Sequence, residues 1–152
     1  MKKSLSAFAL MLALVALPLT NAFAQDARPL TDRQMDLIET NVLANLGSPS
    51  MELRASTMQL LIDLKKTHPS YNIGYAVLPM METLKSDEKP EFRILAALTL
   101  YHLDSELGRY AVERRAQFDS NDRVARHCAA LARNWGKGTV STDLLAETQR
   151  EF

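Results

Sequence analysis

The 152-residue chain has too few cysteines for a disulfide framework and no excess of charge of either sign. Cys128 is the only cysteine, so no intrachain disulfide can form, and its apolar neighbours indicate a buried, unreactive thiol. Lysine and arginine together number 18, and so do aspartate and glutamate, which leaves no global positive field to attract nucleic acid. We therefore expect one domain stabilised by packing, with no nucleic-acid partner.

Motifs for catalysis and for metal binding are also missing. The sequence has no His-Glu-x-x-His pair, Cys-x-x-Cys pair, aspartate-rich calcium loop, Gly-x-Ser-x-Gly elbow or glycine-rich phosphate loop. The three histidines, His68, His102 and His127, have no partner at metal-ligand spacing. We therefore predict a non-enzymatic protein with no cofactor and no metal, and leave open a site assembled from distant residues.

The N-terminal segment has the pattern of a cleavable signal peptide. Lys2 and Lys3 give it a positive start, residues 5–17 are almost entirely apolar, and residues 22–24 read Ala-Phe-Ala, a small-x-small cleavage pattern. The apolar run is shorter than the roughly 20 residues that a membrane-spanning helix needs. We therefore predict a signal peptide over residues 1–24, export to the periplasm or outside the cell, and no transmembrane span in the mature chain. A retained N-terminal anchor is the alternative.

The remainder of the chain predicts an all-α domain over residues 31–152, preceded by a short leader over residues 25–30. No segment combines β-branched residues, strict alternation and turn signals in the way that strands do. Gly74 and Pro79 predict a break within residues 70–86. The other expected helices span about residues 31–46, 49–67, 90–103, 104–118 and 119–135, with a last helix from Ser141.

Local signals add specific expectations for caps and core. Thr31 and Gln34 have the spacing of a capping box, and Gly47 is expected to end the first helix in the left-handed conformation. The segment 90–103 is apolar nearly all round, so we place it in the middle of the protein. Helical spacing also predicts buried side chains at Leu53, Leu60, Leu107, Tyr110 and Phe118.

Three segments align on an arginine that opens the second helix of a hairpin. They read Leu-Arg-Ala-Ser-Thr around Arg54, Phe-Arg-Ile-Leu-Ala-Ala around Arg93 and Ala-Arg-His-Cys-Ala-Ala around Arg126. This pattern resembles short HEAT-like repeats, whose second helix reads apolar-Arg-x-x-Ala-Ala. Such repeats place an aspartate six residues before the arginine, where it ladders with arginine, and Asp87 holds that place before Arg93. In the other two units the equivalent residues are Ser48 and Ser120.

The resemblance implies a short α-solenoid of about three antiparallel hairpins plus a C-terminal helix, with a concave face that binds a protein or peptide. An irregular helical bundle is the alternative. We therefore expect a protein-interaction or scaffold module, with self-association through its open ends as a further expectation. A membrane-surface or small-ligand-binding protein remains the alternative function. The candidate partner-binding residues are Arg54, Arg93, Tyr101, His102, Arg123 and Arg126, although an ion-pair ladder within the repeats would also explain the arginines.

Overall fold

The computed structural model describes residues 30–137, and this part of the chain consists of helices and short connections without a β-strand. The all-α prediction is therefore confirmed. The segments expected as signal peptide and leader, up to residue 29, and the helix expected from Ser141 lie outside the described residues. The elements are α1 (Asp32–Leu46), α2 (Met51–Thr67), the 3₁₀ helix η2 (Gly74–Ala76), α3 (Val77–Ser86), α4 (Pro90–Leu103), α5 (Glu106–Phe118) and α6 (Asp122–Asn134).

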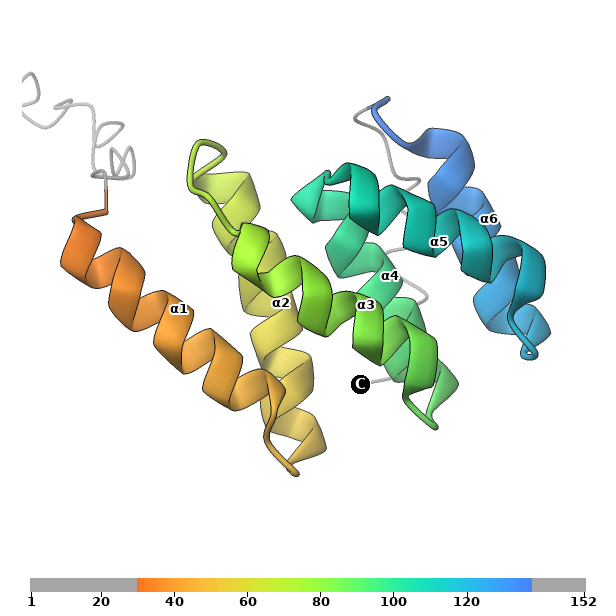
Figure 1. Ribbon diagram of the computed structural model, residues 1–152, viewed down its shortest axis with the longest axis horizontal. Coiled ribbons are helices and arrows are strands. Elements are labelled where there is room, and N and C mark those ends of the chain that lie inside the picture. Colours follow the sequence, from red (N-terminus) through yellow and green to blue (C-terminus); the bar gives the residue numbers. More distant parts are fainter. Residues whose placement is uncertain (1–29, 138–152) are drawn as a thin grey trace, which may run out of the picture.

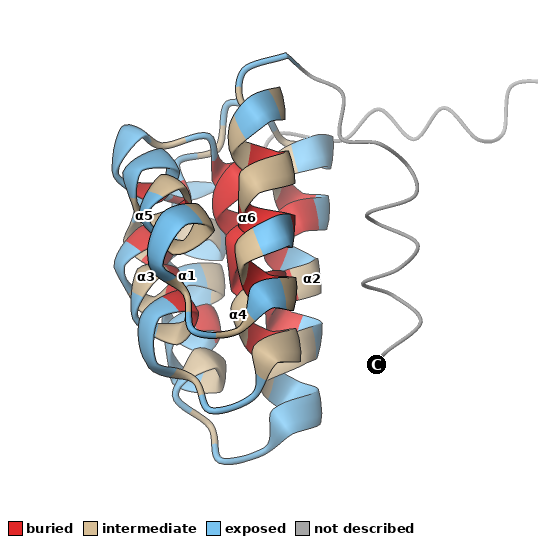
Figure 2. Ribbon diagram, turned by 90° about the vertical axis from the view of Figure 1, so that its right-hand side faces the viewer, coloured by how far each residue is buried: buried red, intermediate tan, exposed pale blue. Residues whose placement is uncertain are grey.

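The helices form two layers, with α1, α3 and α5 in one and α2, α4 and α6 in the other (Figure 1). Figure 2 shows the layers side by side, with the buried residues between them. Within the layers α2 packs on α4, α4 on α6, and α3 on α5, while α1 contacts α2 and η2. Among the described helices, none combines the length and the hydropathy required to cross a lipid bilayer.

Helix α4 lies in the middle, as its all-round apolar sequence predicts. It contacts α2, α3, α5 and α6. Because neighbours cover it on several sides, even its Thr99 is buried, and the Thr99 hydroxyl donates to the Leu95 carbonyl at 2.8 Å. The buried residues of this helix are Phe92, Ile94, Leu95, Ala96, Ala97, Leu98, Thr99, Leu100, Tyr101 and Leu103.

The burial predicted for several apolar residues of the outer hairpins is wrong. Leu60 of α2 is 51% exposed and Phe118 of α5 is 68% exposed, and Leu53, Leu107 and Tyr110 are exposed as well. Helical spacing identifies residues that share a face, but no other described helix covers these faces. Instead, Gly108 and Val112 of α5 are buried.

Gly108 allows α5 to approach α4 closely. A Cβ atom at this position would lie 2.9 Å from the Ser105 hydroxyl oxygen and 3.1 Å from Cδ2 of Leu100. A Cβ atom here would force the Ser105 hydroxyl and the Leu100 side chain to shift. Glycine at this position therefore allows the close contact between α5 and α4 without such a shift.

The caps partly follow the predictions. The Thr31 amide donates to Gln34 Oε1 at 2.9 Å and the Gln34 amide donates to the Thr31 hydroxyl at 3.4 Å, so the capping box is confirmed. The prediction of a left-handed conformation at Gly47 is wrong, because φ is −84° at this residue after the end of α1. That conformation occurs instead at Asp104, where φ is 53°, after the end of α4. Ser105, not Asp104, caps α5.

The break predicted within residues 70–86 is confirmed. Residues Gly74–Ala76 form the separate 3₁₀ helix η2, and α3 begins at Val77. Pro79 is the third residue of α3, where the amide of an ordinary residue would have no partner within the helix. Proline at this position therefore costs the helix no hydrogen bond.

Candidate functional site

Two ion pairs join consecutive hairpins along one edge of the described stack. Arg54, near the start of α2, donates to the Asp87 carboxylate at 2.7 Å, and Arg93, near the start of α4, donates to the Asp119 carboxylate at 2.9 Å. Each aspartate lies at the turn of the following hairpin, directly after α3 or α5. The side chain of Asp119 is 2% exposed, so the second pair is almost removed from water. We refer to the two pairs as the arginine ladder.

Each ladder aspartate also shapes its own turn. Asp87 accepts a hydrogen bond from the Lys89 amide at 3.0 Å, and Asp119 accepts one from the Asn121 amide at 2.9 Å. The equivalent of Asp87 in the last hairpin is therefore Asp119, and the alignment on Ser120 is one residue out of register. One carboxylate thus satisfies a turn amide and an arginine at the same time.

The first hairpin has the same turn with a neutral acceptor. The Ser48 hydroxyl oxygen accepts the Ser50 amide at 3.1 Å, and Ser50 then caps α2 through the Leu53 amide at 3.2 Å. No described hairpin precedes this turn and presents an arginine to it. Ser48 accepts the hydrogen bond of the turn amide as aspartate does in the other two turns, and because it is neutral it leaves no unpaired charge there.

Two of the six candidate partner-binding residues, Arg54 and Arg93, belong to the arginine ladder. Arg54 lies over the Phe92 ring at 4.5 Å, in addition to its pair with Asp87. Arg93 also donates to the backbone oxygen of Asp87 at 3.0 Å, and its side chain is 13% exposed. Both guanidinium groups are therefore directed at the protein itself.

Tyr101 is buried at the end of α4, where its hydroxyl donates to the Asn134 carbonyl at 3.1 Å. Its ring makes edge contacts with Trp135 and with His102, at centroid distances of 5.3 Å and 5.5 Å. Burial raises the pKa of Tyr101, with a smaller contribution from nearby Asp104. Tyr101 thus anchors the end of α6 to α4 and presents little surface to a partner.

His102 is half-buried on α4, and its Nε2 has no hydrogen-bond partner in the described part of the chain. Burial lowers the pKa of His102, the nearby charge of Lys66 lowers it further, and Asp63 opposes the change. His127 is on a different helix, where its Nδ1 lies 2.9 Å from the Arg123 carbonyl oxygen. Within residues 30–137 no three His, Cys, Asp or Glu side chains gather in a way that could hold a metal ion.

Arg123 and Arg126 lie on α6. Arg123 pairs with Glu91 of α4 at 3.6 Å, and both side chains are about one-third exposed. Arg126, almost one turn further along α6, is exposed. Of the six candidates, Arg126 is therefore the exposed one, Tyr101 is buried, and the other four are intermediate.

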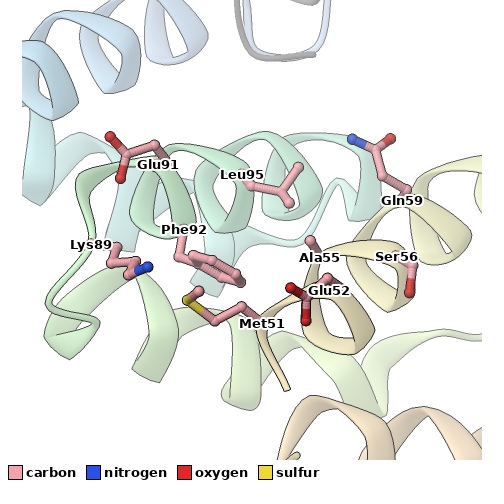
Figure 3. A pocket seen from close by; sticks show the side chains of 9 residues that line it. All are labelled: Met51, Glu52, Ala55, Ser56, Gln59, Lys89, Glu91, Phe92 and Leu95. Carbon is pink, nitrogen blue, oxygen red and sulfur yellow. The ribbon is translucent and has the colours of Figure 1, made fainter. Parts of the chain in front are cut away.

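The groove between α2 and α4 is a better candidate for a binding site (Figure 3). Its volume is about 520 Å³. Figure 3 shows side chains from α2 on one side of it and from α4 and the preceding turn on the other. Apolar atoms of Met51, Ala55, Phe92 and Leu95 line it, and the polar lining consists of Glu52, Ser56, Gln59, Lys89 and Glu91.

The charge at the mouth of this groove is fixed by local hydrogen bonds. Glu52 lies in the first turn of α2, and its own backbone amide and the Ser50 hydroxyl, which donates at 2.9 Å, lower the pKa of its carboxyl group. Glu52 is therefore ionised at neutral pH. The sequence-based candidate residues include none of those that line the groove. The available signal was the small residue Ala55 directly after the ladder arginine, which leaves space between the two helices.

A second groove lies on the opposite layer, between α3 and α5, with a volume of about 470 Å³. Its apolar side chains include Leu78, 67% exposed, and Tyr110, 57% exposed. Arg114 lies beside them, with a guanidinium nitrogen 3.5 Å from the Tyr110 hydroxyl and the guanidinium carbon 5.8 Å from the centre of the Phe118 ring. This surface combines exposed apolar side chains with arginine.

The turn between α3 and α4 contains one spacing that is typical of a catalytic motif. Ser86 and Lys89 have the Ser-x-x-Lys spacing of some hydrolase nucleophiles. However, α3 ends at Ser86 and Lys89 belongs to the turn before α4, so the two residues do not share one helix face. The Ser86 hydroxyl instead lies 2.8 Å from both the backbone oxygen and the carboxylate of Glu82. The Ser86 hydroxyl is therefore engaged by Glu82 at the end of α3.

Comparisons of the chain with protein-family models, with curated proteins and with solved structures find no match. The HEAT-like resemblance therefore receives no support from a relative.

Proposed function

We propose that this chain is an exported helical-repeat protein that acts as a non-enzymatic interaction module and binds a protein or peptide in the groove between α2 and α4. The repeat part of the proposal, a short α-solenoid of three HEAT-like hairpins, is supported by the arginine ladder. Arg54 and Arg93 occupy equivalent places and use equivalent turn aspartates. The export part rests on the signal-peptide pattern of residues 1–24.

The observation that carries the binding proposal is the chemistry of the groove. Apolar side chains of Phe92 and Leu95 lie between charged groups at Glu52, Lys89 and Glu91. Binding sites commonly combine apolar lining with a few polar groups that fix orientation. Two parallel helices also suit an inserted helical segment that presents apolar residues at helical spacing.

The test is capture of a partner by chains in which the groove is filled. Ser56→Trp places a large ring at the groove from an exposed position. Thr40→Trp is the matched control, because Thr40 is also exposed within a helix and its hydroxyl also bonds to a backbone oxygen of its own helix. The bait is the chain from Gln25 to Phe152, cross-linked in an extract of its own source.

We expect one saturable partner to be captured equally by the unaltered chain and by Thr40→Trp. Ser56→Trp should reduce capture at least about tenfold, because a filled groove excludes the anchoring side chain of the partner. Equal capture by both variants, or recovery of the bait alone, would remove the groove as the binding site.

A second candidate function is attachment to an anionic membrane surface, and the surface of α3 and α5 favours it. Leu78, Tyr110 and Phe118 are exposed there beside Arg114. Apolar and aromatic side chains next to arginine suit the boundary between headgroups and acyl chains. Salt-sensitive binding to phosphatidylglycerol vesicles, lost in a Tyr110→Ser and Phe118→Ser double variant and kept in Leu37→Ser, would support this candidate. Absence of vesicle binding at low salt would eliminate it.

A further inference from the structure

The outer face of α6 carries positive charge that the described residues leave exposed. Arg126 and Arg133 are exposed on this helix, and Lys137 is exposed just beyond its end. Positions 126, 133 and 137 share one face of a helix, with the partly buried Ala129 and Ala130 between the arginines. We refer to Arg126, Arg133 and Lys137 as the basic stripe of α6. Small residues between the charges leave room for another helix to approach.

The arginine ladder does not extend to α6. Arg54 and Arg93 each pair with a carboxylate that comes later in the chain, in the hairpin that follows. In the register set by the turn residues Ser48, Asp87 and Asp119, Ala125 is the residue of α6 that corresponds to Arg54 and Arg93. Arg126, the next residue, is exposed one turn after Asp122, and no ion pair holds it among residues 30–137. A carboxylate from the remaining chain would give Arg126 a partner outside the ladder.

The chain after Lys137 has matching chemistry. Residues 138–152 lie outside the described residues, and their sequence contains Asp143, Glu147 and Glu151, four residues apart, with Arg150 as the one cation. On the helix that the sequence predicts from Ser141, these carboxylates share one edge. The neighbouring edge is mostly apolar and carries Val140, Leu144, Leu145 and Phe152.

The spacing of the two sets of charges also agrees. Along a helix, Arg126 and Arg133 are separated by about 10 Å, and Asp143 and Glu151 by about 12 Å. The left-handed Gly136, with φ of 74°, directly follows Trp135 and lets the chain turn sharply after α6. Only a short connection then separates the turn from the predicted helix.

We infer that residues 138–152 fold back antiparallel along the basic stripe of α6 and cover the open end of the described stack. In this arrangement Asp143 lies opposite Arg133 and Glu151 lies opposite Arg126. In this register Ala146 lies opposite Ala130, and Leu144 lies opposite Ala132. The inference does not involve the α2–α4 groove, so it stands or fails independently of partner binding.

Hydrogen exchange on the chain produced from the complete sequence tests the inference. We expect amides of residues 141–152 to exchange at least about tenfold more slowly than in an unstructured peptide. Arg126→Glu with Arg133→Glu should abolish this protection, and adding Asp143→Arg with Glu151→Arg should restore it. The control, Arg33→Glu with Lys66→Glu, reverses two exposed charges elsewhere and should change nothing in this segment.

Unprotected amides in the unaltered chain would overturn the inference. Protection that survives the α6 charge reversal, or that the compensating reversal fails to restore, would overturn the proposed pairing. A second measurement covers the case in which charge reversal disturbs folding. Arg133→Cys with Asp143→Cys should form a disulfide within one chain under mild oxidation, while buried Cys128 stays reduced. Disulfides formed only between chains, or none, would contradict the fold-back.

Discussion

Helices α1 and α4 have nearly the same length but are stabilised in opposite ways. α1 has 15 residues, a complete capping box and one buried residue, Val42. α4 has 14 residues, no side-chain cap and ten buried residues. The comparison shows that local hydrogen bonds define where α1 begins, whereas contacts with neighbouring helices hold α4 in place.

The difference follows from position in the layers. α1 lies at one end and contacts α2 and η2, while α4 contacts α2, α3, α5 and α6. Burial of apolar area is the dominant favourable contribution to folding, so the free energy of local opening should rise from α1 towards α4. The predictions below, in order of decreasing effect, test this gradient.

Truncating a side chain in the middle should have the largest effect. Leu100 of α4 is fully buried and lies against Gly108 of α5. Leu100→Ala leaves a cavity between two helices and should lower the free energy of unfolding by about 2–5 kcal/mol. Leu37→Ala in α1, at a side chain 55% exposed, should change it by less than about 0.5 kcal/mol. Urea denaturation measures both, and equal losses would contradict the gradient.

Removing a ladder carboxylate should have the next largest effect. Asp119→Ala removes the carboxylate that accepts from Arg93 Nη2 and from the Asn121 amide, and should cost about 2 kcal/mol. Glu113→Ala is the control, because it breaks a pair with Arg109 whose side chains are 40% and 56% exposed. Such exposed pairs contribute less than about 1 kcal/mol. A loss from Glu113→Ala as large as that from Asp119→Ala in urea denaturation would refute a stabilising role for the ladder.

Removing the cap of α1 should have a smaller and local effect. Thr31→Ala deletes the hydroxyl of the capping box and should cost about 1 kcal/mol of helix stability. Amides of α1 should then exchange faster, whereas those of α4 keep their rates. Thr40→Ala is the control, because it removes an exposed hydroxyl from the middle of α1. Faster exchange throughout the protein would show that α1 does not open separately.

The smallest effect should be a pH dependence at the edge of α4. Burial, reinforced by Lys66, lowers the pKa of His102 below its ordinary value of 6.5 in the folded state. As the pH falls through 6.5 the unfolded chain therefore binds the proton first, and the free energy of unfolding decreases until the folded His102 also titrates. Urea midpoints at pH 7.5 and 5.5 should differ less in His102→Gln than in the unaltered chain. An unchanged difference would exclude His102 as the source.

The sequence was sufficient for the features that depend on local chemistry. The apolar residues of 90–103, the capping box at Thr31 and the break within residues 70–86 all matched the structure. It was insufficient where one residue type serves two purposes. Asp104 and Asp119 fit an N-cap as well as a turn, and the structure uses both aspartates at the ends of the preceding helices.

Features that depend on two distant segments could not be predicted. The spacing of Leu60 and Phe118 shows that each belongs to an apolar face, but not whether another helix covers that face. The α2–α4 groove needs Ala55 and Leu95 to lie on either side of one hollow. Nothing in the periodicity of either helix records that arrangement.

The arginine ladder also sets an order in time. Arg54 is tied to an aspartate 33 residues further along the chain, and Arg93 to one 26 residues further along. A chain that leaves the ribosome from its N-terminus therefore presents each arginine well before the carboxylate that receives it. Each of these ion pairs can form only after the turn of the next hairpin has been synthesised. A nascent chain that ends before Asp87 therefore exposes helices without this ion pair to proteases and chaperones.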